Sequence, residues 1–265
     1  MKRKGVLLAD LHCGHRAGLT PPEYWDRGVK WHDVQSGCWD RYTDLVAKIG
    51  RVNFVVCNGD AIDGTGYRSG GTELVTADLF EQAKMAAESL ALWKAKTYIL
   101  SYGTDYHVGV SGEDFEEAVA DKLREKTNAK VILSSHPFVD IGGVMFDIKH
   151  HIGGSSTPYT AGTAILKDKM HNEQWFLDGE GQPLADVVLR AHIHQFAWFG
   201  GHRNGSPWLA IRQPALQAAG TKFGGRRCSG VVHWGLIEAA IEDGTIDFTA
   251  HICDVSANKT EAIKL

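Results

Sequence analysis

Residues 6–12 read Val6-Leu7-Leu8-Ala9-Asp10-Leu11-His12 and join an apolar run to two side chains that can bind a metal ion. A short apolar run of this kind, bounded by glycine and polar residues, predicts a buried β-strand. Asp10 and His12 stand two residues apart, the spacing at which side chains of a strand point to the same side. We therefore expect both to reach one ion where the strand opens into a loop.

Four further apolar runs end on possible metal ligands in the same way. These runs and the residues that follow them are Phe54–Val56 with Asp60, Tyr98–Leu100 with His107, Val144–Phe146 with His150 and His151, and Val187–Leu189 with His192 and His194. In layered α/β folds, ligands bind outside the carboxyl ends of the strands. Five strand ends would thus bring Asp and His side chains to one place, which favours a metal-dependent hydrolase.

The composition is that of a folded protein with one domain. The chain has 265 residues, 43% of them apolar, which is enough for a substantial core. It has no internal repeat, low-complexity tract or Pro/Ser-rich linker, so we expect a single domain over residues 1–265. The formal net charge of -4 argues against a strongly basic nucleic-acid-binding protein. It does not exclude nucleic acid, because bound divalent cations would add positive charge where a phosphate docks.

The N-terminus and the cysteines favour a cytoplasmic protein that does not enter a membrane. The basic start Met1–Lys4 precedes an apolar run too short for a signal peptide, and no apolar stretch approaches the ~20 residues that cross a bilayer. The five cysteines are odd in number and widely spaced, without a C-x-x-C pair. We expect ordinary reduced thiols, with neither a disulfide framework nor a cysteine zinc site.

Helices and strands are expected to alternate first, with strands dominating later. An aromatic-rich stretch over about 13–35 predicts a loop insertion, either an ordered flap over the site or a loop packed on its own aromatic residues. Helices are expected over Cys38–Ile49, Glu73–Ala95, 111–124 and Thr160–Trp175. Beyond the five runs above, strands are expected as a pair within Val131–Lys149 and over His194–Phe199, Trp208–Arg212, Val231–Ile241 and Thr245–Cys253. This order predicts two facing sheets with helices outside.

The residue types at the strand ends indicate two metal ions and a phosphate ester. One carboxylate can bridge two cations, and Asp60 would unite two half-sites in this way. Mixed Asp and His ligands suit Mn, Fe, Zn or Ni and fit a calcium-only site poorly. Two ions about 3.5–4 Å apart lower the pKa of a shared water and hold the oxygens of a phosphoryl group. A phosphate ester is therefore the expected substrate class.

These motifs together resemble the calcineurin-like metallophosphoesterase superfamily. Asp10-x-His12, Gly59-Asp60, a glycine-led third motif with a histidine, a histidine after a later strand and His192-x-His194 follow the family's order, from residue 5 to about 200. The resemblance implies a four-layer α/β/β/α sandwich of two facing mixed sheets. It also implies that Asp10, His12, Asp60 and His194 hold one ion, and that Asp60, His150 and His192 hold the other.

The third motif departs from the family's pattern. The family usually has Gly-Asn-His-Asp or Gly-Asn-His-Glu, in which the Asn binds the second metal and the His protonates the leaving group. This chain has Gly103-Thr104-Asp105-Tyr106-His107, so a threonine, which is a poor ligand, stands in place of the Asn. We expect His107 to be the catalytic histidine that donates a proton to the departing alkoxide. Thr104, Asp105 and His107 remain alternatives for the ligand that replaces the Asn.

Spacing leaves the roles of a few neighbouring residues open. His150 follows its strand directly and is favoured over His151 as a ligand. Asp63 fits a turn residue or a hydrogen-bond partner of a ligand better than it fits a ligand. His136, which precedes Pro137, is expected to be structural.

We therefore expect a metal-dependent phosphoric ester hydrolase, in which a metal-bound hydroxide attacks a phosphodiester of a nucleotide or nucleic acid. The diester preference rests on aromatic and basic residues that could stack on a base or grip phosphate, although core and solvated roles are the default for them: Trp25, Trp198, Trp208, Arg68, Arg203, Lys222, Arg226 and Arg227. A phosphomonoesterase of the same fold and a catalytically impaired binding or scaffold protein are the alternatives. The oligomeric state stays open.

Overall fold

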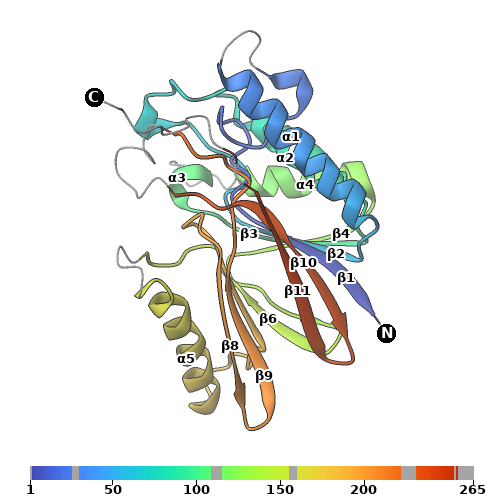
Figure 1. Cartoon of the computed structure of the whole chain (residues 1–265), viewed down its shortest axis with the longest axis vertical. Coiled ribbons are helices and arrows are strands. Elements are labelled where there is room, and N and C mark those ends of the chain that lie inside the picture. Colours follow the sequence, from blue (N-terminus) through green and yellow to red (C-terminus); the bar gives the residue numbers. More distant parts are fainter. Residues whose placement is uncertain are drawn as a thin grey trace, which may run out of the picture.

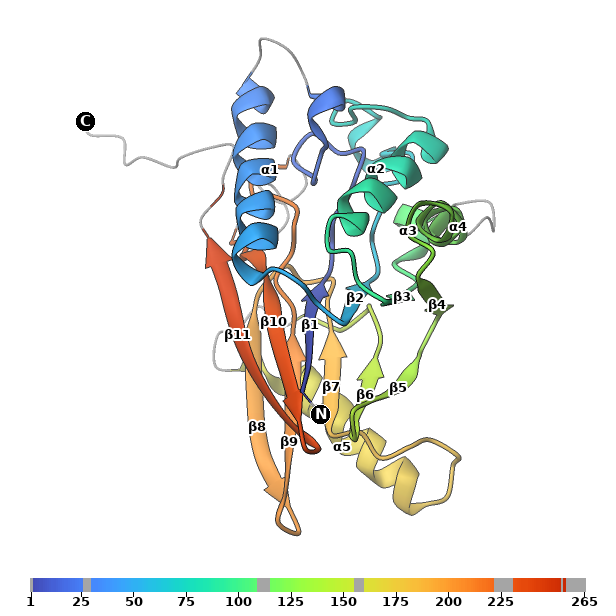
Figure 2. The same cartoon turned by 90° about the vertical axis from the view of Figure 1, so that its right-hand side faces the viewer.

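Two β-sheets form the centre of the molecule (Figures 1 and 2). The computed structural model describes residues 2–25, 30–108, 115–154, 160–221, 231–253 and 255. The six-stranded sheet has the order β11-β10-β1-β2-β3-β4, with bounds β1 Arg3–Leu8, β2 Phe54–Asn58, β3 Thr97–Ser101, β4 Lys130–Ser134, β10 Trp234–Glu242 and β11 Thr245–Cys253. The five-stranded sheet has the order β5-β6-β7-β9-β8, with bounds β5 Phe138–Ile141, β6 Val144–Ile148, β7 Val187–Arg190, β8 Ala197–Arg203 and β9 Ser206–Arg212.

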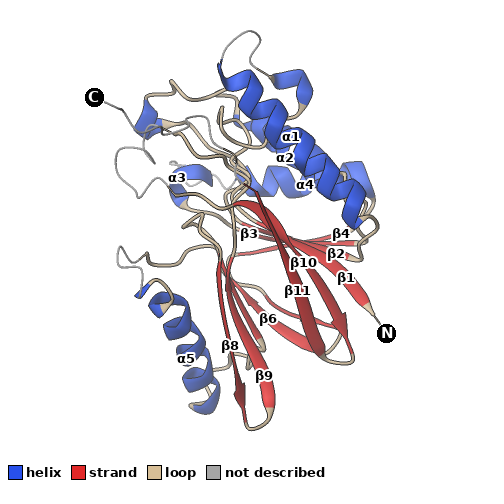
Figure 3. Cartoon of the chain, in the orientation of Figure 1, coloured by secondary structure: helices blue, strands red, loops and turns tan. Residues whose placement is uncertain are grey.

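Helices cover the outer side of each sheet, as the colouring of Figure 3 shows. The six-stranded sheet is covered by α1 Lys30–Ile49, α2 Leu79–Ala91 and α4 Phe115–Thr127, and the five-stranded sheet by α5 Thr163–Leu177. The remaining helical segments are single turns, namely η1 Pro22–Tyr24, η2 Tyr67–Ser69 and α3 Asp105–Val108.

Hydrophobic clusters among the described residues fill the spaces between four layers. The cluster between α1, α2, α4 and the six-stranded sheet contains Val6 and Leu8 of β1. Leu7, the residue between them, belongs to the cluster that joins the two sheets. A smaller cluster joins Ile165 of α5 to Val188 of β7. Alternate residues of one strand thus serve two interfaces, which confirms the expected α/β/β/α sandwich and explains why the buried strands are apolar on both faces.

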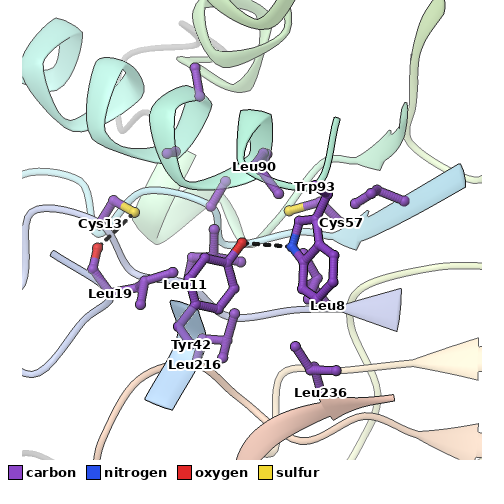
Figure 4. Packing of buried hydrophobic residues seen from close by; sticks show 14 of the residues in the cluster. Leu8, Leu11, Cys13, Leu19, Tyr42, Cys57, Leu90, Trp93, Leu216 and Leu236 are labelled. Carbon is purple, nitrogen blue, oxygen red and sulfur yellow. Dashed lines mark hydrogen bonds between the residues drawn. The ribbon is translucent and has the colours of Figure 1, made fainter. Parts of the chain in front are cut away.

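The cluster under α1 and α2 also contains buried polar atoms with partners (Figure 4). The Tyr42 hydroxyl donates to the carbonyl of Ser89 at 2.9 Å and accepts from Trp93 Nε1 at 2.8 Å. Cys13 Sγ donates to the carbonyl of Leu19 at 3.1 Å. The described cysteines are free thiols, as expected: Cys13, Cys38, Cys57 and Cys253.

Parallel pairing places the carboxyl ends of the central strands at one edge of the sandwich. In the six-stranded sheet, β1 is parallel to β2 with Leu8 opposite Cys57, and β2 is parallel to β3 with Asn58 opposite Ser101. In the five-stranded sheet, β6 is parallel to β7, which is parallel to β9. Because parallel strands run the same way, the loops after β1, β2, β3, β6 and β7 all leave from this edge.

The first helix starts earlier than expected. It begins at Lys30, whereas the sequence predicted a loop to about residue 35 and a helix from Cys38. Trp31 and Val34 pack against the same cluster as Cys38 and Tyr42, so the apolar stripe continues about two turns towards the N-terminus. The aromatic-rich irregular stretch is therefore shorter, and Trp31 belongs to the helix.

Other boundaries differ by a few residues or by one strand. α2 begins at Leu79 rather than Glu73, because the Asp78 side chain caps it by accepting from the backbone N–H groups of Phe80 and Glu81. Val131–Lys149 was expected to contain two strands and contains parts of three, since the chain leaves the six-stranded sheet after β4 and enters the other at β5. The first residues of the helix expected over 111–124 lie outside the described residues, and the described part of that helix is α4. Among the described helices, none has the length and apolar character that crossing a bilayer requires.

Candidate metal centre

The first group of possible ligands joins the loops after β1 and β7. Asp10, His12 and His194 each offer one ligand atom, and these atoms lie within 4.8 Å of one another. His194 Nε2 is 3.2 Å from Asp10 Oδ1 and 3.3 Å from His12 Nε2. Asp10 and His12, which follow β1, thus lie next to a residue from a distant part of the chain. His12 and His194 are separated by 182 positions.

The second group joins the loops after β2, β6 and β7. Ligand atoms of Asp60, His150 and His192 also lie within 4.8 Å of one another. His150 Nε2 is 3.0 Å from Asp60 Oδ2, and the rings of His150 and His192 have centroids 5.5 Å apart.

The two groups form one cluster rather than two separate sites. His150 Nε2 of the second group is 3.9 Å from Asp10 Oδ1 of the first. His12 Nε2 of the first group is 4.0 Å from Asp60 Oδ2 of the second. The structure therefore brings together all six residues that the sequence singled out as metal ligands, with Asp60 facing both groups as a bridging carboxylate must.

Backbone conformation aims several of these residues into the cluster. In the described part of the chain, nine non-glycine residues have positive φ, and five of them are the candidate ligands Asp10, His12, Asp60, His192 and His194. Positive φ is uncommon outside glycine, and residues held in such conformations gather at functional sites. The turn after each strand end bends the chain so that its side chain points back over the edge of the sandwich.

Two glycines leave room for the cluster. Gly59 has φ +73°, and a Cβ added there would lie 2.5 Å from the ring of His150. A Cβ at Gly103 would lie 2.1 Å from Asp60 Oδ1. A larger residue at either position would displace a candidate ligand.

The Nδ1 atoms of three histidines are already bonded, which directs each Nε2 atom towards the cluster. His12 Nδ1 donates to Asp63 Oδ1 at 3.0 Å, and His150 Nδ1 donates to the carbonyl of Asn58 at 2.7 Å. His107 Nδ1 donates to the carbonyl of Asp63 at 2.7 Å. Histidines that bind metals usually give their second ring N–H to a carboxylate or carbonyl in this way. Asp63 is thus a hydrogen-bond partner of a candidate ligand, one of the two roles considered for it.

Two buried atoms of the cluster test whether metal ions fit. Asp10 Oδ1 and His150 Nε2 have no hydrogen-bond partner. His194 Nε2 is 3.2 Å from Asp10 Oδ1, and Asp60 Oδ2 is 3.0 Å from His150 Nε2. Neither of these contacts has the geometry of a hydrogen bond. An unsatisfied buried polar atom is costly, and a cation in each of the two groups would satisfy these atoms. The imidazole and carboxylate donors therefore fit divalent Mn, Fe, Zn or Ni.

The pKa values show how strongly the carboxylates act on their neighbours. Burial alone would raise the pKa of Asp10 and of Asp60, but adjacent histidines hold both well below the usual range. Burial would lower the pKa of His12, yet the nearby Asp10 carboxylate and the hydrogen bond to Asp63 raise it to about 10. Burial is likewise outweighed at His150, where the charges of Asp60 and Asp10 raise the pKa to about 9. The cluster is therefore an anionic site that attracts protons when no other cation occupies it.

The third motif does not supply a ligand beside His150 and His192. The Thr104 backbone N–H donates to Asp60 Oδ1 at 2.7 Å, and its hydroxyl lies 3.2 Å from the same oxygen. Asp105 is exposed. His107 groups with His12 and Asp60, with His107 Nε2 4.0 Å from Asp60 Oδ2. Thr104 thus orients the Asp60 carboxylate, while His107 lies on the side of the first group.

Three further histidines that the sequence singled out differ in burial and in their partners. His150 is buried within the cluster, whereas His151 is exposed and only packs beside His192, with ring centroids 4.9 Å apart. His136 Nε2 bonds to Asp147 Oδ1 at 2.7 Å, in the structural role expected of it.

Some residues that shape the centre carried no clear signal in the sequence. Glu116 lies in the first turn of α4, and its carboxylate is buried and accepts from the backbone N–H of Gly103 at 3.0 Å. Burial raises the pKa of Glu116 to about 8. Asn58 is a polar residue at the end of an apolar strand, and that position was the only available hint of its role.

The residues proposed to grip a nucleotide have other partners or lie outside the description. Trp25 Nε1 donates to the carbonyl of Thr20 at 2.8 Å, and Trp198 packs edge-on against Phe248 at 5.6 Å. Trp208 packs against the cluster under α5. The Arg68 side chain and residues 222–230, which include three of the basic residues, are outside the described part of the chain.

Comparisons with known proteins give only distant likenesses. No family model and no curated protein matches the sequence. Zinc-complexed wild-type Vps29 from Entamoeba histolytica is 13% identical, with TM-score 0.38 over 94% of this chain and 98% of that chain. The Thermotoga maritima protein TM1076 is 11% identical, with TM-score 0.37 over 95% of this chain and 99% of that chain. The sulfate thiohydrolase SoxB of Thermus thermophilus, in complex with glycerol, is 11% identical, with TM-score 0.38 over 96% of this chain and 57% of that chain.

Likenesses this distant do not assign the chain to a family. The fold is therefore defined by the layers and the strand orders of the chain itself. The chain is a four-layer α/β/β/α sandwich of two facing mixed sheets. At the edge where its parallel strands end, it carries Asp and His groups that could hold metal ions.

Proposed function

We propose that this chain is a phosphoric ester hydrolase of the calcineurin-like metallophosphoesterase superfamily that works with two divalent metal ions. The observation that carries the proposal is the convergence of five strand ends on one buried cluster with Asp60 between its two halves. Asp10, His12, Asp60 and His194 would hold one ion, and Asp60, His150 and His192 the other.

The bound ions would supply a water of lowered pKa and two positive charges for the phosphoryl oxygens. The protein's own residues perform the remaining tasks. Thr104 orients the Asp60 carboxylate, and Asp63 orients His12 through its carboxylate and His107 through its carbonyl. Burial and the neighbouring His12 lower the pKa of His107. We assign His107 Nε2 the role of proton donor to the departing alkoxide, with Nδ1 held by Asp63.

The substrate class within this proposal is a phosphodiester, with a nucleotide or nucleic acid as the narrower possibility. The support for the narrower class is the set of aromatic and basic residues in the sequence, although Trp25, Trp198 and Trp208 have packing partners. Hydrolysis of mononucleotides, cyclic nucleotides and single- and double-stranded DNA, compared under one condition, would assign the class. Preference for a monoester would replace the diester proposal and leave the metal centre intact.

A scaffold protein with the same fold is the second candidate. Its support is Thr104, which stands where the family usually has an Asn ligand. The backbone N–H and the hydroxyl of Thr104 both donate hydrogen bonds to Asp60. A metal-free, inactive protein after purification would favour this candidate.

The deciding experiment removes the bridging carboxylate. We expect the wild-type chain to bind two ions and to hydrolyse bis-p-nitrophenyl phosphate with Mn²⁺. Asp60→Asn should reduce turnover by more than about 100-fold, since loss of an outer partner of a ligand alone costs about 10–100-fold. Asp40→Asn, on the exposed side of α1, is the matched control and should keep both metal content and turnover. Equal activity of the two variants would contradict the proposal.

A further inference from the structure

Beneath the candidate metal centre lies a chain of buried polar side chains that the proposed chemistry does not use. Ser101 Oγ donates to Asn58 Oδ1 at 2.7 Å, and Asn58 Nδ2 donates to Gln213 Oε1 at 2.7 Å. Gln213 Nε2 then donates to the backbone carbonyl of Leu8 at 3.0 Å. All three side chains are at most 1% exposed. We call Ser101, Asn58 and Gln213 the amide chain.

The direction of every hydrogen bond in the amide chain follows from its last member. The Leu8 carbonyl can only accept, so Gln213 must present its NH₂ group there and its oxygen to Asn58. Asn58 must then present its own NH₂ group to Gln213, which agrees with a second bond from Asn58 Nδ2 to the carbonyl of Lys149 at 3.3 Å. The Asn58 oxygen is left to accept from Ser101. No member can be reversed without placing two acceptors or two donors against each other.

The amide chain contacts the strand ends at the positions that precede the candidate ligands. Leu8 and Asn58 lie two residues before Asp10 and Asp60, and Lys149 lies directly before His150. The Asn58 backbone carbonyl also accepts from His150 Nδ1 at 2.7 Å.

The same contacts join the two sheets. Asn58 and Ser101 end β2 and β3 of the six-stranded sheet. Gln213 follows β9 of the five-stranded sheet, and its backbone N–H donates to the carbonyl of Arg190, two residues before His192, at 2.8 Å. Apolar packing between sheets tolerates small shifts, whereas a buried hydrogen-bond chain is satisfied at one relative placement.

We propose that Ser101, Asn58 and Gln213 are positioning residues that set the spacing between metal ligands carried by different sheets. This inference rests on the proposed function, because it assigns the amide chain a task only if metal ions bind above it. Asn58 has the central place, since its side chain joins the sheets while its carbonyl orients His150.

The test converts one buried amide into a carboxylate. Asn58→Asp places an acceptor against Gln213 Oε1 and the Lys149 carbonyl, so the chain must break. We expect Mn²⁺ affinity, measured by calorimetry on the full chain, to fall by about 10–100-fold, the usual effect of losing an outer partner of a ligand. Electron paramagnetic resonance of the Mn²⁺-loaded protein should show the magnetic coupling between two neighbouring ions in the wild type and its loss in the variant.

Asn172→Asp is the matched control. Asn172 is also buried, and its Nδ2 donates to the carbonyl of Pro183 at 2.9 Å while its Oδ1 accepts from the backbone N–H of Ala185 at 2.9 Å. It connects α5 to the segment before β7 and contacts none of the candidate ligands in these bonds. We expect this variant to lose thermal stability and keep wild-type Mn²⁺ affinity and coupling.

Two milder variants keep the inference testable if Asn58→Asp does not fold. Ser101→Ala and Gln213→Met remove hydrogen bonds without adding charge, and both should weaken Mn²⁺ binding more than Asn172→Asp does. Unaltered Mn²⁺ affinity in these variants, with normal wild-type binding, would overturn this inference alone. A wild-type chain that binds no Mn²⁺ would overturn the proposed function and this inference with it.

Discussion

Single residues in the candidate metal centre are held by backbone contacts as well as by their side chains. The Asp10 backbone N–H donates to the carbonyl of Gly59 at 3.2 Å, and that of His12 donates to the carbonyl of Asp60 at 3.0 Å. These bonds tie the loops after β1 and β2 together where Asp10, His12 and Asp60 all have positive φ. Such conformations cost roughly 1–3 kcal/mol each and persist only where surrounding contacts hold them. The arrangement of these candidate ligands is therefore held by the backbone itself.

His107 gives a prediction at this scale. Replacing it by His107→Gln should reduce hydrolysis of an alkyl phosphodiester by about 10²–10⁴-fold, because an alkoxide needs a proton to depart. Hydrolysis of bis-p-nitrophenyl phosphate should change far less, because nitrophenolate leaves without a proton. Parallel kcat measurements with the two esters check this. An equal loss with both esters would contradict the role of proton donor and favour His107 as a metal ligand.

Among the elements, α2 supports the centre from outside the cluster. Gln82 of α2 is buried, and its Oε1 accepts from the backbone N–H groups of Asp63 and Gly64 at 3.1 and 2.9 Å. Its Nε2 donates to the carbonyl of Gly64 at 2.8 Å. α2 thereby fixes the loop that carries Asp63, and Asp63 in turn orients His12.

The cap of α2 yields a prediction on stability. Asp78 accepts from the backbone N–H groups of Phe80 at 2.9 Å and Glu81 at 3.3 Å, so Asp78→Ala should lower the free energy of unfolding by about 0.5–2 kcal/mol. Urea denaturation measures this change, and Asp78→Ser, which keeps a capping oxygen, should recover most of it. Mn²⁺ affinity should stay at the wild-type value, because the variant keeps the bond from the Gln82 backbone N–H to the carbonyl of residue 78 and the Gln82 side-chain bonds to Asp63 and Gly64. A variant with unchanged stability would show that the cap is dispensable.

At the scale of the whole molecule, the fold concentrates charge by facing one sheet edge against another. The six-stranded sheet contributes Asp10, His12 and Asp60, and the five-stranded sheet contributes His150, His192 and His194. Neither sheet alone carries all six candidate ligands. Any change that shifts the sheets relative to each other should therefore affect both halves of the centre.

The stability of the metal-free protein should depend on pH through this centre. The folded pKa values of His12 and His150, about 10 and about 9, lie above the usual value for histidine of about 6.5. Their stabilising effect is therefore fully present below about pH 6.5 and is lost as the pH rises through 9 to 10. Asp10 and Asp60 have lowered pKa values, so their contribution is present above about pH 4 and lost below it.

Thermal unfolding in the presence of a chelator, measured from about pH 5 to pH 10, tests this expectation. The melting temperature should decline on the alkaline side, and Mn²⁺ should reduce the decline because it replaces the displaced protons. His12→Gln lacks one of the raised pKa values and should show a shallower decline than the wild type. If the protein in the presence of the chelator became more stable as the pH rises to 10, the raised pKa values of His12 and His150 would be contradicted.

The sequence by itself determined the strands, the two facing sheets and the residue types at the strand ends. Apolar runs such as Val6–Leu8 and Phe54–Val56 are local signals, because burial on both faces requires consecutive apolar residues. The predicted start of α1 at Cys38 is wrong, because Trp31 belongs to the apolar stripe of the helix and not to the aromatic-rich loop. Whether residues 1–265 form one domain stays a prediction.

Only the tertiary structure decided which neighbours of these motifs face the pocket. His150 is buried in the folded chain, whereas His151 is exposed. Thr104 hydrogen-bonds to Asp60, and Asn58 hydrogen-bonds to Gln213, which is 155 positions away in the chain. Local sequence cannot reveal such contacts, because hydrogen bonds between distant segments depend on how two sheets pack. Short sequence motifs thus determine the residue types of the candidate ligands. The distances between those residues in space depend on the contacts between the layers.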